Sequence, residues 1–293
     1  TRGNNYYYRS EVIDDGYIVM GAEQIIIDEN CLTPGTDTGS YNTAPSVSID
    51  DNTGFGVMGI IGLFPGGEEG TSEISNYHQP IFKITEDWGL TWHGPDQNDE
   101  CSFYYLGDDL FADVIASFPE VYTDECGGYE YYIMDFWSYY DFDYKIDANG
   151  DIHILMSVVP SDDYYIFWID GAGWYHFTID SDHLDNPGQV NTETGWNWSM
   201  VVEAKDTWIF NDNTAGSYVW NTMASLSFDR DNPDVVYVVT SMATPGPAAD
   251  DSIFDDPCYV VTLSDYPEWS EDIYVIKSED GGQTWWNPLN VSN

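Results

Sequence analysis

The chain has 293 residues, of which 42% are hydrophobic and 16% aromatic, so it can build a large packed core and is not a disordered chain. Its 52 acidic and 7 basic residues give a formal net charge of -45, which repels phosphate backbones and anionic lipid surfaces. Nucleic acid partners and membrane insertion are therefore not expected. The acidity instead favours cations, basic partners or a high-salt medium, or it is a solvated surface without a specific ligand.

Residues 1–44 are expected to form a strand-rich N-terminal arm. Aromatic or apolar runs at 6–8, 17–20 and 24–28 are separated by turn formers such as Gly16 and Gly21. The arm would either stand apart or add strands to the last sheet of the fold. The chain opens on Thr1 rather than Met, which indicates a removed leader or a fragment.

A strand–turn–strand pattern then occurs three times. Residues 45–54, 144–151 and 225–234 each contain a short strand and a turn rich in Asp, Asn, Gly or Pro, and a more apolar strand follows each of them. The turns begin at Asp50, Asp147 and Asp229. Each interval between them has room for about two units of the 40–50 residues that are usual for a propeller blade.

A second repeat has the pattern S/T-x-D-x-G-x-T-W and occurs at residues 85–92 and 278–285, each time after an apolar run. The Ser or Thr and the Asp can hydrogen-bond the backbone of their own turn, the Gly supplies a positive φ, and the Trp folds back over the hairpin. These residues are Thr85, Asp87, Gly89 and Trp92 in the first copy and Ser278, Asp280, Gly282 and Trp285 in the second.

This octapeptide resembles the Asp-box, or BNR repeat, of the sialidase-like β-propellers, where it marks the turn between the third and fourth strands of a blade. The resemblance implies an all-β fold: a single β-propeller of about six four-stranded blades over residues 45–293, with five or seven blades as alternatives. Residues 96–128 are expected to be an insertion. Residues 167–174 look like a worn copy of the octapeptide, and no amphipathic helix is expected.

Four cysteines occur without a C-x-x-C motif, which argues against a zinc ribbon or a thioredoxin-type site. Their even number and wide spacing favour two disulfides in an oxidising, extracellular compartment. Among the alternative pairings we favour Cys31 with Cys258 and Cys101 with Cys126. Sequons at Asn197 and Asn290 are compatible with N-glycosylation of a secreted protein.

A sialidase is not expected, although the octapeptide resembles a repeat of that family. The family's enzymes are known for an arginine triad that grips the substrate carboxylate, because a planar anion is held best by bidentate guanidinium groups. This chain has only Arg2, Arg9 and Arg230, the first two in the arm and the third inside a turn between two aspartates. No catalytic residues are assigned, and the balance favours a chain that is not an enzyme.

A site for neutral glycans is an alternative. The aromatic-rich segment 129–144 places Asp135 and Asp143 among rings such as Trp137 and Tyr139, which would set a stacking platform beside the two carboxylates that glycosidic hydrolysis requires. Packing of these rings between sheets is the favoured interpretation.

Calcium is the cofactor that the turns favour, because alternating oxygen ligands in a tight turn suit a hard cation. The ligands would be Asp147, Asn149 and Asp151 in one turn and Asp229, Asp231 and Asp234 in another. Ordinary Asx turns between strands are the favoured alternative. The five histidines are scattered and are expected to be surface or packing residues.

Together these features predict a non-catalytic extracellular scaffold or adhesion protein, with a self-assembling surface-layer or filament subunit as one form of it. The Tyr-rich arm or the sheet edges would pair with a neighbouring copy to give a homo-oligomer. The alternatives are a propeller that binds or hydrolyses neutral glycans and an ordinary secreted domain of a halophile.

Overall fold

The computed structural model describes residues 4–12, 16–32, 34–35, 39–40, 43–62, 79–106, 108–124, 127–162, 170–180, 183–184, 195–203, 210–212, 217–219, 224–245 and 269–292. The chain forms two compact units. Unit 1 comprises Thr1–Phe111, Tyr144–Ile154 and Thr178–Asn197, and unit 2 comprises Ala112–Asp143, Leu155–Phe177 and Trp198–Asn293.

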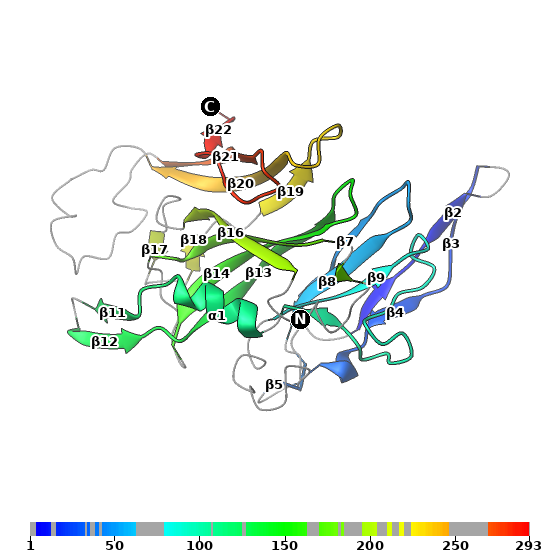
Figure 1. Cartoon of the computed structure of the whole chain (residues 1–293), viewed down its shortest axis with the longest axis horizontal. Coiled ribbons are helices and arrows are strands. Elements are labelled where there is room, and N and C mark those ends of the chain that lie inside the picture. Colours follow the sequence, from blue (N-terminus) through cyan, green and yellow to red (C-terminus); the bar gives the residue numbers. More distant parts are fainter. Residues whose placement is uncertain are drawn as a thin grey trace. The chain divides into compact units, whose positions relative to one another are not determined.

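Three four-stranded sheets dominate the fold, and in each of them the strands are hydrogen-bonded in chain order (Figure 1). The first sheet holds β7 (Ser46–Ile49), β8 (Gly56–Gly62), β9 (Gln79–Thr85) and β10 (Tyr104–Tyr105). The second holds β13 (Asp135–Ile146), β14 (Ile152–Ser161), β15 (Gly173–Ile179) and β16 (Trp196–Glu203). The third holds β19 (Ala224–Phe228), β20 (Val236–Pro245), β21 (Trp269–Ser278) and β22 (Leu289–Asn290).

These sheets confirm the prediction of an all-β fold and the meaning of the strand–turn–strand pattern. Its three copies form β7–β8, β13–β14 and β19–β20, the first two strands of each sheet. The apolar second strands β8 and β14 are buried along their whole length, which is typical of inner strands covered on both faces. The predicted number of about six blades stays a prediction, because the described residues hold three four-stranded sheets.

The octapeptides follow the third strand of the first and third sheets, β9 and β21, and precede the fourth strands β10 and β22. The worn copy expected at 167–174 does not have this position. Residues 167–169 lie outside the described part, and Trp174 is inside β15, so the segment leads into the third strand of its sheet rather than out of it. Its Gly173 and Trp174 belong to β15 itself, and the Trp174 side chain is fully buried.

The described residues of the N-terminal segment form short paired strands. β1 (Asn5–Tyr7) pairs with β4 (Gln24–Ile27), β2 (Ser10–Val12) with β3 (Ile18–Met20), and β5 (Pro34–Gly35) with β6 (Gly39–Ser40). Ile26 and Ile27 of β4 form one core cluster with Met58, Ile60 and Ile81 of the first four-stranded sheet. The described arm therefore packs on the first sheet.

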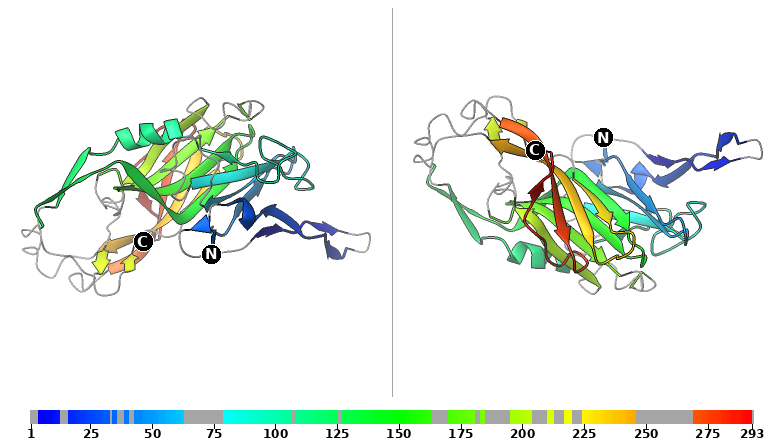
Figure 2. Two further views of the ribbon diagram at one scale, coloured as in Figure 1. Left: turned by 90° about the horizontal axis from the view of Figure 1, so that it is seen from below. Right: turned by 90° about the horizontal axis from the view of Figure 1, so that it is seen from above.

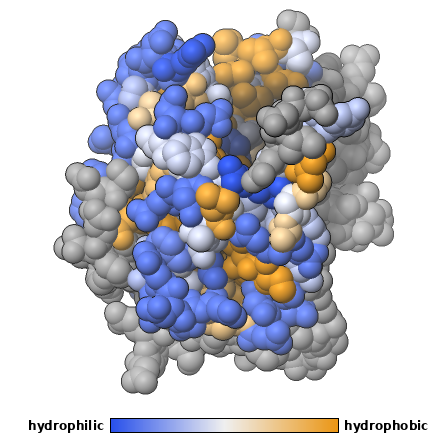
Figure 3. All heavy atoms as spheres, turned by 90° about the vertical axis from the view of Figure 1, so that its right-hand side faces the viewer, coloured by the Kyte–Doolittle hydropathy of each residue, from blue (hydrophilic) through white to orange (hydrophobic). Residues whose placement is uncertain are grey.

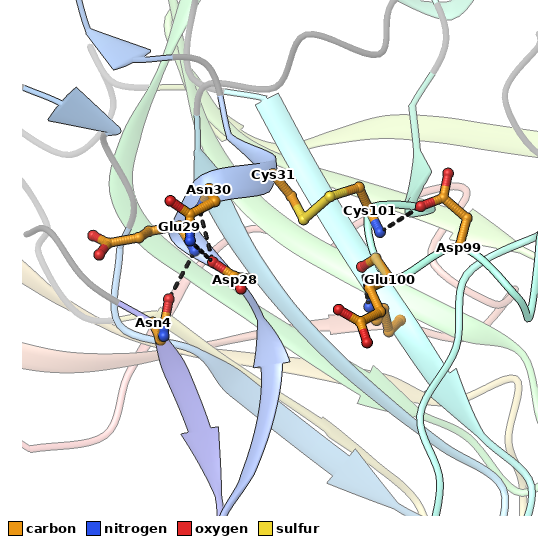
Figure 4. Close-up of a disulfide and its surroundings, with 9 residues drawn as sticks. Asn4, Asp28, Glu29, Asn30, Cys31, Asp99, Glu100 and Cys101 are labelled. Atoms are coloured by element: carbon orange, nitrogen blue, oxygen red, sulfur yellow. Dashed lines mark hydrogen bonds between the residues drawn. A yellow bond between two sulfur atoms is a disulfide. The ribbon is translucent and has the colours of Figure 1, made fainter.

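This packing also corrects the disulfide assignment. A short 3-10 helix, η1 (Glu29–Cys31), follows β4 and lies beside the loop that precedes β10, where Cys31 is bonded to Cys101 with their Cα atoms 5.1 Å apart (Figure 4). Both predicted pairs are thus wrong, because each required one of these two cysteines for a different partner. Cys126 and Cys258 lie outside the described residues.

One α-helix within the described part, α1 (Asp108–Ala116), was not expected. Its apolar residues Leu110, Phe111 and Val114 are buried, whereas Ala112 and Asp113 are exposed, so the short helix is amphipathic. Two further two-stranded sheets pair β11 (Val121–Asp124) with β12 (Tyr129–Tyr132) and β17 (Phe210–Asp212) with β18 (Ser217–Val219). No described helix is long and apolar enough to cross a membrane.

Candidate functional site

The two octapeptide turns are held by the same hydrogen bonds. In the first, the Thr85 hydroxyl donates to Asp87 Oδ1 (2.8 Å) and accepts from the amide of Gly89 (2.9 Å), and Thr91 donates to Asp87 through its amide and its hydroxyl. In the second, Ser278, Asp280, Gly282 and Thr284 repeat each of these bonds. Thr85 and Ser278 are fully buried.

These bonds keep both aspartates ionised and occupied. Burial opposes ionisation of Asp280, but the hydrogen bonds donated by Thr284 and Ser278 outweigh it and lower the pKa of the carboxyl. The pKa of Asp87 is lowered in the same way, against burial, by Thr91 and Thr85. Such carboxylates hold their own turns shut, which is a structural role.

The two tryptophans also contact elements outside their own hairpins. Trp92 meets Tyr7 of β1 edge to face, with ring centroids 5.4 Å apart. Trp285 donates from Nε1 to the Ser199 hydroxyl of β16 (2.8 Å) and meets the buried His176 ring edge to face. Each octapeptide therefore anchors an adjacent strand within its own unit.

The turns proposed as calcium sites are Asx turns in the structure. Asp147 Oδ1 accepts from the amides of Asn149 and Asp151, each at 2.9 Å, and Asp229 Oδ1 accepts from the amides of Asp231 (2.9 Å) and Asn232 (3.2 Å). The backbone amide of Asp234 donates to the side-chain oxygen of Asn232 (3.3 Å). No cluster of three or more His, Cys, Asp or Glu side chains suited to a metal occurs among the described residues. Calcium binding at these turns stays a prediction.

The acidic strand β13 has carboxylates in different situations. Asp143 is buried and accepts from the Ser225 hydroxyl (2.8 Å) and the Leu226 amide (3.0 Å) of β19, so it ties two sheets together within unit 2. Asp135 is buried and accepts from the next amide along the chain, whereas burial raises the pKa of Asp141 to about 6. Trp137 is half-buried, and the side chain of Tyr139 lies outside the described part. The glycan platform predicted here stays a prediction.

The two sequons differ in what their asparagines contact. Asn197 is exposed on β16, where nothing in its burial opposes a glycan. The Asn290 amide nitrogen donates to Asp272 (2.9 Å) and to the Tyr274 hydroxyl (3.3 Å), so a glycan on it would replace hydrogens that are in use. N-glycosylation of both stays a prediction.

A cavity of about 420 Å³ lies at the turn end of the first sheet, within unit 1. It is assembled from the β7–β8 turn, the end of β9, the loop before β10 and the β13–β14 turn. Its lining consists of Asp50, Thr53, Phe55, Ile84, Glu86, His93, Pro95, Gln97, Tyr104, Ala148, Asn149, Gly150 and Leu184. We call this the turn cavity.

Two serines of β7 bring the walls of the turn cavity together. Ser46 accepts from the amide of Tyr144 (3.1 Å) and Ser48 accepts from the amide of Ile146 (3.2 Å), both at the end of β13. The Tyr144 ring packs over Gly59, where a side chain would clash, and its hydroxyl donates to the carbonyl of Ile60 (3.2 Å). The turns that follow β7 and β13 are thus aligned side by side.

The polar groups of the turn cavity are mainly acceptors. The Thr53 hydroxyl and the Asn52 amide hydrogen-bond Asp50 and lower the pKa of its carboxyl, so Asp50 is ionised. Glu86 is largely exposed at the rim, with Oε2 3.8 Å from His93 Nε2. The amides of Gln97 and Asn149 add donors, and the Phe55 ring adds an apolar wall. None of the described residues that line the turn cavity is Lys or Arg, so the site favours neutral or cationic ligands over anions.

A second cavity, of about 590 Å³, borders the disulfide and shares His93 and Gln97 with the first. Glu23, Asp28, Asp99 and Glu100 make its lining acidic. Lys83 lies at its wall, where burial lowers the pKa of the amine although nearby carboxylates favour its charged form. Its Nζ donates to the Glu100 carbonyl (2.7 Å) and lies 5.0 Å from the centre of the Phe103 ring.

Sequence reasoning identified the two turns of the turn cavity but not the cavity itself. Asp50 and Asn149 belong to two copies of the strand–turn–strand pattern, and Glu86 stands inside the first octapeptide. Their convergence depends on contacts between strands that are about a hundred residues apart in the chain, such as the bond between Ser46 and Tyr144.

Comparison with known proteins gives distant structural similarities. No family model and no curated protein matches the chain. The levansucrase from Gluconacetobacter diazotrophicus aligns with 85% of this chain and 53% of its own, at 11% identity and a TM-score of 0.45. A GH43_12 protein retrieved from a capybara gut metagenome aligns with 98% of this chain and 40% of its own, at 12% identity and a TM-score of 0.40. The catalytic domain of a β-fructofuranosidase from Microbacterium saccharophilum K-1 aligns with 85% of this chain and 52% of its own, at 7% identity and a TM-score of 0.37. The chain spans about half the length of these structures, and similarity of this degree assigns it neither a family nor an activity.

Proposed function

We propose that this chain is an extracellular glycan-binding module that holds neutral sugars in the turn cavity. The observation that carries the proposal is the lining of that cavity: ionised Asp50 and rim Glu86 as acceptors, the Gln97 and Asn149 amides, and the Phe55 ring. Sugar hydroxyls bond carboxylates and amides, and the apolar face of a sugar ring packs on an aromatic side chain. The volume of about 420 Å³ suits one or two sugar rings.

Binding is favoured over hydrolysis at this site. Hydrolysis needs a carboxyl that is protonated near neutral pH beside one that is ionised. Asp50 has a lowered pKa, and Asp141, whose pKa is raised to about 6, does not line the cavity. The disulfide between Cys31 and Cys101 supports an oxidising compartment.

The proposed architecture is an Asp-box β-propeller. Its support is the matching hydrogen bonds of the two octapeptides and their place between the third and fourth strands of four-stranded sheets. A shared motif of this kind indicates a fold and not a ligand, so the binding proposal rests on the cavity alone.

The two octapeptides supply a matched pair of variants for the binding test. Glu86 and Glu279 occupy the same position in the two copies, but only Glu86 lines the turn cavity. We expect a ligand found on an array of neutral oligosaccharides to bind Glu86→Gln about tenfold more weakly in calorimetry, because one charged acceptor is lost. Glu279→Gln should bind like the wild type.

Three results would contradict the proposal of glycan binding. No binding across the array, equal effects of the two glutamine variants, or a preference for basic peptides over sugars would overturn it. Phe55→Ala should also weaken sugar binding, and it separates a stacked sugar from a ligand held by charge alone. Release of reducing sugar during the assay would replace binding with hydrolysis.

A scaffold function is the second candidate, and one observation favours it. Strand β3 of the arm presents an apolar side chain to solvent at each of its three residues, Ile18, Val19 and Met20. A self-assembling subunit needs such a surface, and a glycan-binding module does not.

A further inference from the structure

Strand β3 is exposed on both of its faces. Every residue from 16 to 23 is exposed, and the exposed fractions of Tyr17, Ile18, Val19 and Met20 are 67%, 70%, 47% and 58%. Successive side chains of a strand point to opposite faces, so Ile18 and Met20 occupy one face and Tyr17 and Val19 the other. A strand that covers an ordinary core would hide one of these sets.

The backbone of the hairpin is also available. β3 pairs with β2 from Val12↔Ile18 to Ser10↔Met20, and the sheet that they form has two strands. The outer edge of β3 is therefore an edge strand with backbone groups that can pair with another strand. A two-stranded sheet is marginal in water by itself, and β3 is exposed on both faces, which favours an added partner.

The base of the hairpin is fixed to unit 1. The Gly21 amide donates to the Arg9 carbonyl (2.7 Å), and the Tyr8 hydroxyl donates to Glu23. β1 and β4, which continue from this base, pack on the first sheet through Tyr7, Ile26 and Ile27. The hairpin thus extends beyond the strands that anchor it, as both views of Figure 2 show. Figure 3, which looks from the side where the hairpin lies in Figure 1, shows apolar groups among hydrophilic ones.

The charge of the chain limits what can cover this surface. Residues 16–22 carry no charge, in a chain whose formal net charge is -45. The carboxylates of the hairpin are Glu11 of β2, which pairs with Val19, and Asp14 and Asp15 between the two strands. An anionic membrane would be repelled by the rest of the molecule. Two copies of the chain also repel each other over most of their surface, and the uncharged strand β3 is where they can meet at the lowest electrostatic cost.

We propose that β3 pairs antiparallel with β3 of a second copy across a two-fold axis at Val19. The product is a four-stranded sheet in the order β2-β3-β3-β2. In this register Val19 lies opposite Val19, and Ile18 lies opposite Met20 of the other copy, so every central pair is apolar. A two-fold axis requires a surface that is complementary to itself, and this symmetric apolar register meets that requirement. The proposal does not depend on the glycan site.

A charge-swap experiment tests the register. Sedimentation velocity over a concentration series should show a monomer–dimer equilibrium for the full chain, stronger in about 1 M than in about 0.15 M NaCl because salt screens the acidic surfaces. Val19→Lys and Val19→Glu should each weaken the dimer at least about tenfold, since like charges then lie directly opposite. An equimolar mixture of the two variants should restore dimers. Leu289→Lys changes an equally exposed apolar side chain on β22 and should leave the equilibrium unchanged.

Cross-linking gives a second readout of the same geometry. Val19→Cys should form a dimer that is covalent on a non-reducing gel, at a rate well above that of a Leu289→Cys control. A monomer at every concentration and salt level overturns the proposal, as does a dimer that both Val19 charge variants preserve. Val19-dependent binding of the monomer to neutral lipid vesicles would assign the hairpin to a membrane surface and would overturn it as well.

Discussion

The fourth residue of each octapeptide has a left-handed backbone, but the two copies fill that position differently. Gly281 has φ 71° and Trp88 has φ 58°, and each is followed by a glycine with positive φ, Gly282 and Gly89. A side chain at positive φ costs about 1 kcal/mol or more, so Trp88 is strained where Gly281 is not. The Trp88 ring lies against Gly54, and its amide donates to the Gly54 carbonyl (2.9 Å), contacts that offset part of this strain.

Alanine at the two adjacent glycines should separate backbone strain from steric clash. Gly281→Ala meets nothing within 4 Å, so we expect a loss of only about 1 kcal/mol in unfolding free energy. The new Cβ of Gly282→Ala would lie 2.3 Å from His176 Cε1, so its loss should exceed about 2 kcal/mol. Urea unfolding of both variants measures the difference, and equal losses would contradict this geometry.

Asp141 should make stability depend on pH. Burial raises its pKa from 3.8 to about 6, so the folded protein holds the proton more tightly than the unfolded chain. The stability that this proton contributes is full below about pH 4, declines as the pH rises to about 6, and is absent above that.

Asp141→Asn, which imitates the protonated carboxyl, should therefore be more stable than the wild type at pH 7 by about 1–2 kcal/mol, after allowance for partial exposure to solvent. The difference should vanish near pH 4. Urea unfolding at the two pH values tests this, with Asp113→Asn at an exposed helix position as the control. A gain at pH 4 as large as at pH 7 would exclude titration of Asp141 as its cause.

At the level of elements, the local patterns of the sequence predicted more than the contacts between them. The turn of Thr85 and Asp87 could be predicted because its donors and acceptors lie within eight residues of one another. α1 escaped prediction because two turns of helix give few positions from which to recognise a periodicity. The partner of Cys31 could not be found from spacing, since it depends on β4 packing against Met58 and Ile60 of the first sheet.

The disulfide should stabilise the folded protein by joining η1 to the loop that precedes β10. It closes a loop with a sequence separation of 70 residues, and a cross-link of that span is worth about 4 kcal/mol in the chain-entropy model. We expect the double variant Cys31→Ser, Cys101→Ser to lose a few kcal/mol of unfolding free energy in urea, at the upper end of the usual range for disulfides. Reductant should remove the stability difference between the wild type and the variant, because any bond through Cys126 or Cys258 is reduced in both. A variant as stable as the oxidised wild type would refute this.

At the scale of the whole molecule, the net charge of -45 should dominate the response to salt. Self-repulsion of the folded chain weakens as the Debye length falls, so the melting temperature should rise with NaCl. The Asp147 carboxylate already accepts hydrogen bonds from the amides of its own turn, and its Oδ2 lies 3.7 Å from His153 Nε2. CaCl₂ at matched ionic strength should therefore not raise the melting temperature further. A larger rise with millimolar Ca²⁺ that EDTA reverses would instead establish the calcium sites.

The composition predicted a large core and the octapeptides an all-β fold, but neither predicted how the surface is used. Both the turn cavity and the hairpin depend on which segments the fold brings together or leaves uncovered. Ser46 and Tyr144 are an example, since nothing in either local sequence indicates that they bond. The sequence motif at Asp50 predicts a turn, and only the three-dimensional structure places that turn beside Asn149.

The position of the disulfide also determines how the chain responds to a protease. A single cut anywhere between residues 31 and 101 opens the loop without releasing a fragment, because Cys31 and Cys101 lie on opposite sides of the cut. The nicked protein would migrate as one covalent species until it is reduced and then separate into two pieces. A cut elsewhere frees its fragment immediately, provided that no bond through Cys126 or Cys258 spans the site. Paired gels with and without reductant thus show whether a vulnerable peptide bond lies inside or outside the loop that Cys31 and Cys101 close.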